Sequence, residues 1–258
     1  MMRVFLLLGC FCIALPTVAG SLDANEQRMV EWIDAHSEDA IALLEETVNI
    51  SSGTMNHAGV RRVGDVMRRE LEGLGFDVEW VELPPEMDRA GHIFGRKVTG
   101  SGKKFVMIGH LDTVFEADDD FQGFVREGDI ATGPGVDDMK GGNAVIIYAL
   151  KALQEIGALE DIPVVVAYTG EEEKTGRPLD VSRKELVEAG KWADYGLGFE
   201  GAVRFDDSDW GTIARRSSSG WILTVAGRQA HSSGIFGENV GAGAIFEASR
   251  ILNAFYEE

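Results

Sequence analysis

Three short apolar runs in the chain are each followed at once by side chains that can bind a metal ion. The runs are residues 104–108, 162–168 and 195–199, and the side chains that follow them are His110 with Asp112, Glu171 to Glu173, and Glu200. Short apolar runs of this kind are typical of strands buried on both faces of a parallel sheet. Open α/β sheets bind ligands at the carboxyl ends of such strands. We therefore expect a sheet that carries a polar site at one edge.

Helical and extended patterns alternate along most of the chain. Amphipathic helices are predicted over residues 23–49, 57–74, 139–156 and 182–189, and two further strands over residues 76–81 and 93–98. Alternation of this kind implies a mainly parallel sheet covered by helices on both faces. The predicted fold class is therefore α/β, with one main domain over residues 21–212.

From about residue 213 the pattern changes. Residues 221–226 alternate as a strand with one solvated face, a loop carries His231, and residues 238–256 read as a long helix. This order is expected for the opening strand and helix of a second, smaller α+β domain. Residues 213–258 are therefore predicted to be the beginning of such a domain.

The first 20 residues predict a secretory signal peptide. Arg3 precedes an apolar stretch over residues 4–15, and small residues follow it, an order typical of a segment that is cleaved on export. This stretch is too short for a membrane span, which takes ~20 residues. We expect a secreted or periplasmic protein, cleaved after Ala19 or Gly20 and not attached to a membrane afterwards.

Both cysteines, Cys10 and Cys12, lie inside the predicted signal. Cleavage would leave no thiol, which excludes cysteine catalysis and thiolate zinc ligands from the mature chain. Leu7 to Cys10 faintly resembles a lipoprotein processing site, but the apolar run before Cys10 is too short for one. The 24 Lys and Arg residues against 43 Asp and Glu residues give a net charge of −19. Such acidity disfavours nucleic acid and anionic membranes as partners.

The polar residues at the strand ends and turns suit a divalent metal better than a nucleophile triad. His110 and Asp112 share a face of a strand end, so Asp112 can orient the imidazole through its second nitrogen. Asp138 lies at a strand-to-helix turn, where one carboxylate could bridge two cations. Glu172 and Glu173 project in different directions, so one can bind metal while the other faces a water molecule. Each pattern alone also fits a plain structural role, such as a helix cap or a charged turn.

Taken together, these residues resemble a known family. Spacings of 28, 35 and 27 residues separate His110, Asp138, Glu173 and Glu200. From about residue 104 onward the chain is similar to the dinuclear zinc peptidases, the family of glutamate carboxypeptidase, acetylornithine deacetylase, succinyl-diaminopimelate desuccinylase and aminoacylase. The resemblance implies two zinc ions per complete site. His110 and Glu200 would hold one zinc ion, Asp138 would bridge both, and Glu173 would bind the second.

The same resemblance implies catalytic roles. Glu172 would be the general base that takes a proton from a metal-bridging water and passes it to the leaving amine, and Asp112 would orient the ligating imidazole. Residues 227–234 resemble a segment of the family's lid, in which His231 would polarise the substrate carbonyl, often across a dimer interface. Residues 213–258 would then begin a lid and dimerisation domain, and a homodimer is expected.

The chain departs from the family pattern in three places. The family's fifth metal ligand is a His that follows the complete lid, and no histidine of this chain lies after His231. We therefore expect the chain to be an N-terminal fragment of a longer protein, so that the activity of the chain alone stays open. Glu171 stands where relatives often carry Asp, and Gly241 to Ala244 replaces the more usual Asn-Ala start of the lid helix.

The expected function is a zinc-dependent hydrolase of the glutamate carboxypeptidase kind, which cuts a peptide's amide bond next to a free carboxylate. Gly133 to Gly135 and Thr169 to Glu173 favour this branch. An N-acyl amino acid deacylase shares the metal centre and is the enzymatic alternative. The alternative from another class is a non-catalytic homologue used for binding or assembly. The missing last His favours it, whereas the retention of Glu172 argues against it.

Overall fold

The computed structural model describes residues 22–201, 203–214 and 220–257. The predicted signal peptide lies outside these residues. Contacts divide the chain into two units after Asp207, and each unit is described by itself. The predicted domain boundary near residue 212 stays a prediction. None of the described helices is both long enough and apolar enough to cross a membrane.

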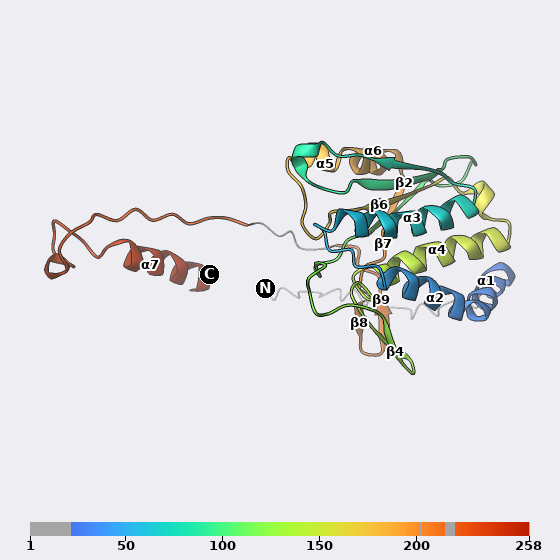
Figure 1. Ribbon diagram of the computed structural model, residues 1–258, viewed down its shortest axis with the longest axis horizontal. Coiled ribbons are helices and arrows are strands. Elements are labelled where there is room, and N and C mark those ends of the chain that lie inside the picture. Colours follow the sequence, from blue (N-terminus) through green and yellow to red (C-terminus); the bar gives the residue numbers. More distant parts are fainter. Residues whose placement is uncertain (1–21, 202, 215–219, 258) are drawn as a thin grey trace, which may run out of the picture. The chain divides into compact units, whose positions relative to one another are not determined.

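The first unit is built on a five-stranded sheet in the order β1-β2-β6-β3-β7 (Figure 1). These strands are β1 (Asp77–Val81), β2 (His92–Lys97), β3 (Phe105–His110), β6 (Val164–Thr169) and β7 (Tyr195–Gly198). β6 and β7 run parallel to β3 on either side of it, whereas β2 runs antiparallel to both β1 and β6. Only β2 therefore opposes the other four strands, which confirms the prediction of a mainly parallel sheet.

Helices cover both faces of this sheet, as the alternation of patterns predicted. The α-helices of the described residues are α1 (Ala24–Ala35), α2 (Ser37–Val48), α3 (His57–Gly73), α4 (Lys140–Glu155), α5 (Leu179–Ser182), α6 (Lys184–Trp192) and α7 (Ala244–Glu257). Short 3₁₀ helices lie at Pro85–Met87, Leu159–Asp161 and Ser232–Gly234, and shorter strands are β4 (Val125–Glu127), β5 (Ile130–Thr132), β8 (Val203–Phe205) and β9 (Ser208–Trp210). Within the first unit, α3 and α4 lie on one face of the sheet and α6 on the other (Figure 1).

The core lies on both sides of β6, whose six residues are all buried. Val164, Val166 and Tyr168 belong to the larger apolar cluster beneath α3 and α4, whereas Val165 and Ala167 belong to the smaller cluster beneath α6. Complete burial of a strand is typical of the centre of a sheet covered on both faces. This packing fixes the register that sets Thr169 beside His110 at the carboxyl edge of the sheet.

Two helix predictions need correction in the first unit. The single helix predicted over residues 23–49 is divided at His36, where α1 ends and α2 begins. The His36 ring stacks on Trp32 and its Nδ1 lies 2.7 Å from the Trp32 carbonyl oxygen, so the side chain competes for a carbonyl of the last helical turn. The helix predicted over residues 182–189 begins at Lys184, because Ser182 closes the separate short helix α5.

Two predictions for the second unit are wrong in detail. Residues 221–226 form no strand, and none of the described strands is hydrogen-bonded to them. A strand is stabilised by its cross-strand pairs, so an alternating pattern without a partner does not become one. The helix predicted over residues 238–256 begins only at Ala244, because Gly241 and Gly243 have left-handed backbone angles that interrupt it.

Candidate metal centre

The candidate site begins at the carboxyl end of β3. His110 is the last residue of this strand and is only 1% exposed. Its Nε2 lies 2.9 Å from Oδ1 of Asp138, in the turn that leads into α4. Glu200, just after β7, completes a group of three residues whose ligand atoms all lie within 4.8 Å of one another. The structure therefore brings together three of the four residues expected to bind metal, and Glu173 is the one outside this group.

A glycine allows α4 and β7 to deliver their carboxylates to the same place. The first turn of α4 packs directly on the end of β7, and a Cβ atom at Gly142 would lie 1.8 Å from the carbonyl oxygen of Phe199. Only a residue without a side chain tolerates this approach. Asp138 lies two residues before that turn, and Glu200 follows Phe199, so this contact sets the separation of the two carboxylates.

Asp112 is buried with 0% exposure and lies between the strand end and the turn after β6. The Nδ1 atom of His110 lies 3.0 Å from the backbone oxygen of Asp112 and 3.5 Å from its Oδ1. The backbone oxygen therefore makes the shorter contact with the imidazole, and the carboxylate serves mainly other donors. These are the hydroxyl of Thr54 at 2.7 Å and the backbone N–H groups of Glu172 and Glu173 at 3.0 and 3.1 Å.

The two N–H contacts to Asp112 hold the turn that carries Glu172 and Glu173. Burial raises the pKa of the Glu172 carboxyl, the His110 imidazole opposes this, and the Glu200 carboxylate adds to it. Burial also raises the pKa of Glu173 to about 7, with Asp138 as the next largest cause. Both carboxyl groups therefore lie in a region of concentrated negative charge beside the three-residue group.

The imidazole responds to the same charges in the opposite direction. Burial by itself would lower the pKa of His110, because it disfavours the charged ring. Hydrogen bonding and charge from Asp112 and Asp138 outweigh burial and raise the pKa of His110 to about 9. The raised pKa of His110 thus reflects the negative charge of the carboxylates beside it.

This donor set fits a divalent metal. In the described part of the chain, no Lys or Arg forms an ion pair with Asp138, Glu172, Glu173 or Glu200. Asp138, Glu172 and Glu200 are exposed and Glu173 is half-buried. Their negative charges repel one another, and a bound metal ion would offset that repulsion. One imidazole nitrogen with several carboxylate oxygens is a ligand set that zinc accepts. The residues therefore suit a metal cation of this kind.

We expect Gly142→Ala to weaken metal binding while the protein still folds. The added methyl group would push Phe199, and with it Glu200, away from Asp138. Overpacking of this kind costs roughly 1–3 kcal/mol of folding stability, and the displacement of Glu200 should in addition weaken zinc binding. Competition with a chromogenic zinc chelator measures it. Gly190→Ala is the matched control, because a Cβ at Gly190 in α6 meets nothing within 4 Å; equal zinc affinity in both variants would contradict the explanation.

Supporting residues were missed by the sequence analysis. The side-chain amide of Asn143 donates to the backbone oxygen of His110 at 2.6 Å. Lys140 is buried at the start of α4, and its Nζ donates to the backbone oxygens of Thr47 and Ile50 at 3.0 and 2.9 Å. Burial lowers the pKa of Lys140 to about 7. A positive charge at the N-terminus of a helix is unfavourable, because it opposes the helix dipole. A lysine at the start of a predicted helix was therefore the one sequence signal that could have indicated a special role for Lys140.

His231 belongs to the second unit and is exposed. Its Nδ1 accepts a hydrogen bond from the Ser233 N–H at 3.2 Å, and the Ser233 hydroxyl lies 2.9 Å from the same atom. Acceptance at Nδ1 leaves the ring proton on Nε2, which can then donate. Since each unit is described by itself, the role of His231 stays a prediction.

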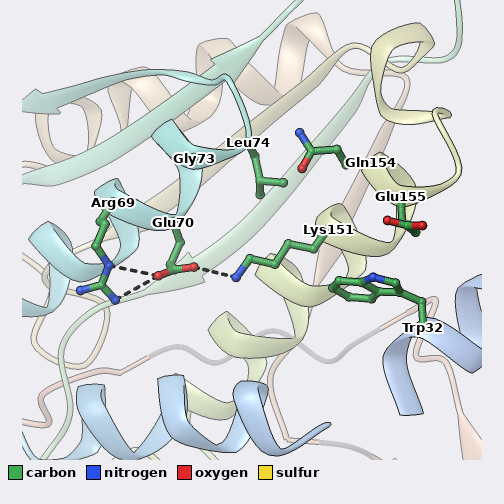
Figure 2. A pocket seen from close by; sticks show the side chains of 8 residues that line it. All are labelled: Trp32, Arg69, Glu70, Gly73, Leu74, Lys151, Gln154 and Glu155. Atoms are coloured by element: carbon green, nitrogen blue, oxygen red, sulfur yellow. Dashed lines mark hydrogen bonds and ion pairs between the residues drawn. The ribbon is translucent and has the colours of Figure 1, made fainter. Parts of the chain in front are cut away.

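A separate pocket of about 400 Å³ opens where α3 and α4 end, at the other edge of the sheet (Figure 2). Three of its charged side chains are paired, because Glu70 lies between Arg69 at 2.9 Å and Lys151 at 2.8 Å. Open α/β sheets bind ligands at the carboxyl edge, which is where His110 lies. We therefore assign this pocket no part in the site.

Comparison with known sequences shows which family the chain resembles. Residues 106–232 match the model of peptidase family M20/M25/M40. Carboxypeptidase G2 from Pseudomonas sp. (strain RS-16) is 32% identical over 255 residues, which cover 93% of this chain and 57% of that protein. A succinyl-diaminopimelate desuccinylase from Rhodospirillum centenum is 30% identical over 205 residues, which cover 76% of this chain and 51% of that protein. The chain thus spans about half the length of these curated relatives.

Solved structures show the same fold. Human carnosine dipeptidase 1 matches with a TM-score of 0.55 and 23% identity, over 67% of this chain and 40% of that chain. An M20 family metallo-carboxypeptidase from Sulfolobus solfataricus matches with a TM-score of 0.51 and 18% identity, over 62% of this chain and 37% of that chain. With the fold, the motif order and the sequence matches in agreement, the chain belongs to peptidase family M20/M25/M40.

Proposed function

We propose that the protein is a zinc-dependent exopeptidase that hydrolyses an amide bond next to a free carboxylate. The observation that carries this proposal is the group of His110, Asp138 and Glu200, whose ligand atoms all lie within 4.8 Å of one another. No Lys or Arg of the described residues forms an ion pair with its carboxylates. His110 and Glu200 would hold one zinc ion, Asp138 would bridge, and Glu173 would hold the second. Both ions, when bound, would supply the Lewis acidity that activates water and polarises the substrate carbonyl.

Glu172 is the residue that we assign to proton transfer. Its backbone N–H donates to Asp112, and its carboxyl lies close enough to His110 and Glu200 for both to affect its pKa. It would take a proton from the attacking water and deliver it to the nitrogen of the leaving amine. A base works best when its pKa is near the working pH, and burial moves the pKa of Glu172 upward in that direction.

The names of two relatives support two candidate classes of substrate. One relative is named a carboxypeptidase and the other a desuccinylase, so both peptides and N-acyl amino acids are candidate substrates. We favour the peptide class because the sequence motifs around residues 133–135 and 169–173 resemble the glutamate carboxypeptidase branch. The predicted signal peptide would place this activity outside the cytoplasm, in the periplasm or the medium.

The test of this proposal is hydrolysis by purified full-length protein loaded with zinc. Dipeptides with a C-terminal glutamate should be cleaved, whereas the same dipeptides with an amidated C-terminal carboxyl should not. Removal of zinc with a chelator should abolish turnover, and added zinc should restore it. Preference for N-acetyl or N-succinyl amino acids would favour the deacylase alternative. Stoichiometric zinc binding without cleavage of any of these compounds would favour a non-catalytic homologue.

We propose that His231 donates a hydrogen bond from Nε2 to the developing oxyanion of a partner subunit's substrate. Loss of one such donor typically lowers kcat by ~10²–10³-fold, so His231→Ala should be inactive but keep its zinc. Mixing this variant with inactive Glu172→Gln protein should restore part of the activity, because one site of a mixed dimer is then complete. Absence of restored activity would place His231 in its own subunit's site. Full activity of His231→Ala alone would remove it from catalysis.

A further inference from the structure

The turn that carries Glu172 and Glu173 is held by two buried carboxylates rather than one. Asp112 accepts the backbone N–H groups of both glutamates from the side of β3. On the other side Glu171, itself 0% exposed, accepts the backbone N–H of Gly176 and the hydroxyl of Ser182, the latter at 2.6 Å. The turn is therefore closed from residue 171 to residue 176 by a side chain that faces away from the metal site.

A guanidinium completes this second anchor. Arg183, whose side chain is 19% exposed, forms an ion pair with Glu171. Its second nitrogen lies 3.2 Å from the Thr175 hydroxyl, which donates to the backbone oxygen of Glu172 at 2.9 Å. The fork of Arg183 thus contacts the turn at two points, one of which leads directly to the backbone of Glu172. A lysine could not reach both points, because its ammonium group lacks the planar fork.

A buried histidine, His92, holds together the two segments that carry Glu171 and Arg183. His92 accepts the Gly170 N–H at Nδ1, at 3.2 Å, and its Nε2 lies 2.9 Å from the backbone oxygen of Ser182. Burial lowers the pKa of His92 to about 4, so the ring is neutral and can accept and donate at once. Residues 170 and 182 are therefore joined through one ring, which sets Arg183 at a fixed position relative to the turn.

We propose that the buried Glu171–Arg183 ion pair is a positioning device that sets the directions of Glu172 and Glu173. The proposal rests on the function proposed above, in which these two residues are the base and a metal ligand. Neither Glu171 nor Arg183 is assigned as a metal ligand or as the base. Their effect passes through the backbone of the turn, and a displacement of about 1 Å at a reacting group can lower turnover ~10²-fold.

Three variants of the full-length protein separate positioning from charge balance. Arg183→Met leaves the Glu171 carboxylate buried without its cation and should lower the thermal midpoint. The double variant Glu171→Gln with Arg183→Met removes both charges, and such neutral replacements of buried pairs are often well tolerated. We expect the double variant to regain most of the thermal midpoint, yet to keep kcat ~10–10²-fold below the unaltered protein with little change in KM.

Two readouts test the proposal without measuring turnover. In the metal-free protein, amide hydrogen exchange at Glu172, Glu173 and Gly176 should be faster in the double variant, and its zinc affinity should be weaker. These readouts remain decisive if the protein hydrolyses none of the substrates tested, so failure of the proposed function is distinguishable. The control Arg69→Met removes an exposed arginine that is paired with Glu46 and Glu70. It should change neither the amide exchange of the turn nor the zinc affinity.

The proposal is overturned if the double variant regains kcat, zinc affinity and amide protection along with its thermal midpoint, because the pair would then only balance buried charge. If the Met variants fail to fold, Arg183→Lys decides the question. It keeps the positive charge but loses one of the two contacts, so kcat and amide protection should fall together. Unchanged values for Arg183→Lys would also overturn the proposal.

Discussion

Replacing Glu172 by Gln in the full-length protein should leave both zinc ions bound and remove nearly all turnover. The amide keeps the size of the side chain but cannot take a proton from water, and Glu172 is proposed to bind neither zinc ion. Loss of a general base typically lowers turnover by ~10²–10⁴-fold. Zinc content by atomic absorption, measured beside kcat on one preparation, gives both quantities.

The matched control for this variant is Glu155→Gln, which lies at the far end of α4. It should keep full activity and full zinc content. If Glu172→Gln loses zinc together with activity, the roles of Glu172 and Glu173 have been exchanged. Burial raises the pKa of both carboxyl groups, so the pKa shifts by themselves do not decide between them.

Asp138→Asn should release both metal ions together, because this residue alone is assigned to both. Its Oδ1 atom lies 2.9 Å from the Nε2 atom of His110, and its carboxylate charge is the next largest cause, after burial, of the raised pKa of Glu173. A neutral amide offers one weakly donating oxygen in place of two charged ones. Zinc retained per chain after dialysis should fall close to zero, and activity should fall with it.

The neighbouring residue Asp137 provides a control within the same turn. Its carboxylate lies against Gly201, where a Cβ atom would come within 3.1 Å of Oδ2. Asp137→Asn should therefore keep both metal ions. One full equivalent of tightly held zinc in Asp138→Asn would show that it does not bridge, and Asp137 would become the candidate for that role.

The ends of the strands were predictable because a buried strand in a parallel sheet is a short apolar run with a sharp polar end. His110 ends such a strand in β3, and the structure brings it together with Glu200 and Asp138. The run before Glu200 also forms a strand, β7, but its four residues are exposed, so the prediction of a buried strand is wrong there. The contacts that support the site residues were not predictable. Thr54 meets Asp112 across 58 positions of sequence, and such a contact leaves no local pattern. The approach of Gly142 to Phe199 likewise depends on how a helix packs on a strand.

The errors share a cause. Residues 221–226 carry the alternation of a strand, but hydrogen-bond partners rather than alternation make a strand. At His36 the apolar stripe continues through a helix break, because the ring captures the carbonyl oxygen of Trp32. In each case the apolar pattern was identified correctly, but a hydrogen-bonding interaction that the pattern does not encode, or the absence of one, decided the conformation.

β3 is paired on both sides, and this has a consequence for how a bound metal ion would leave. β3 is hydrogen-bonded to β6 on one side and to β7 on the other, and the backbone oxygen of His110 is also held by Asn143. Central strands open only when much of the domain unfolds, whereas turns open locally and often. The carboxylates on the turns would therefore detach first, and the imidazole would release the ion last. The dissociation rate of the metal should then follow the opening of the turns rather than the stability of the sheet.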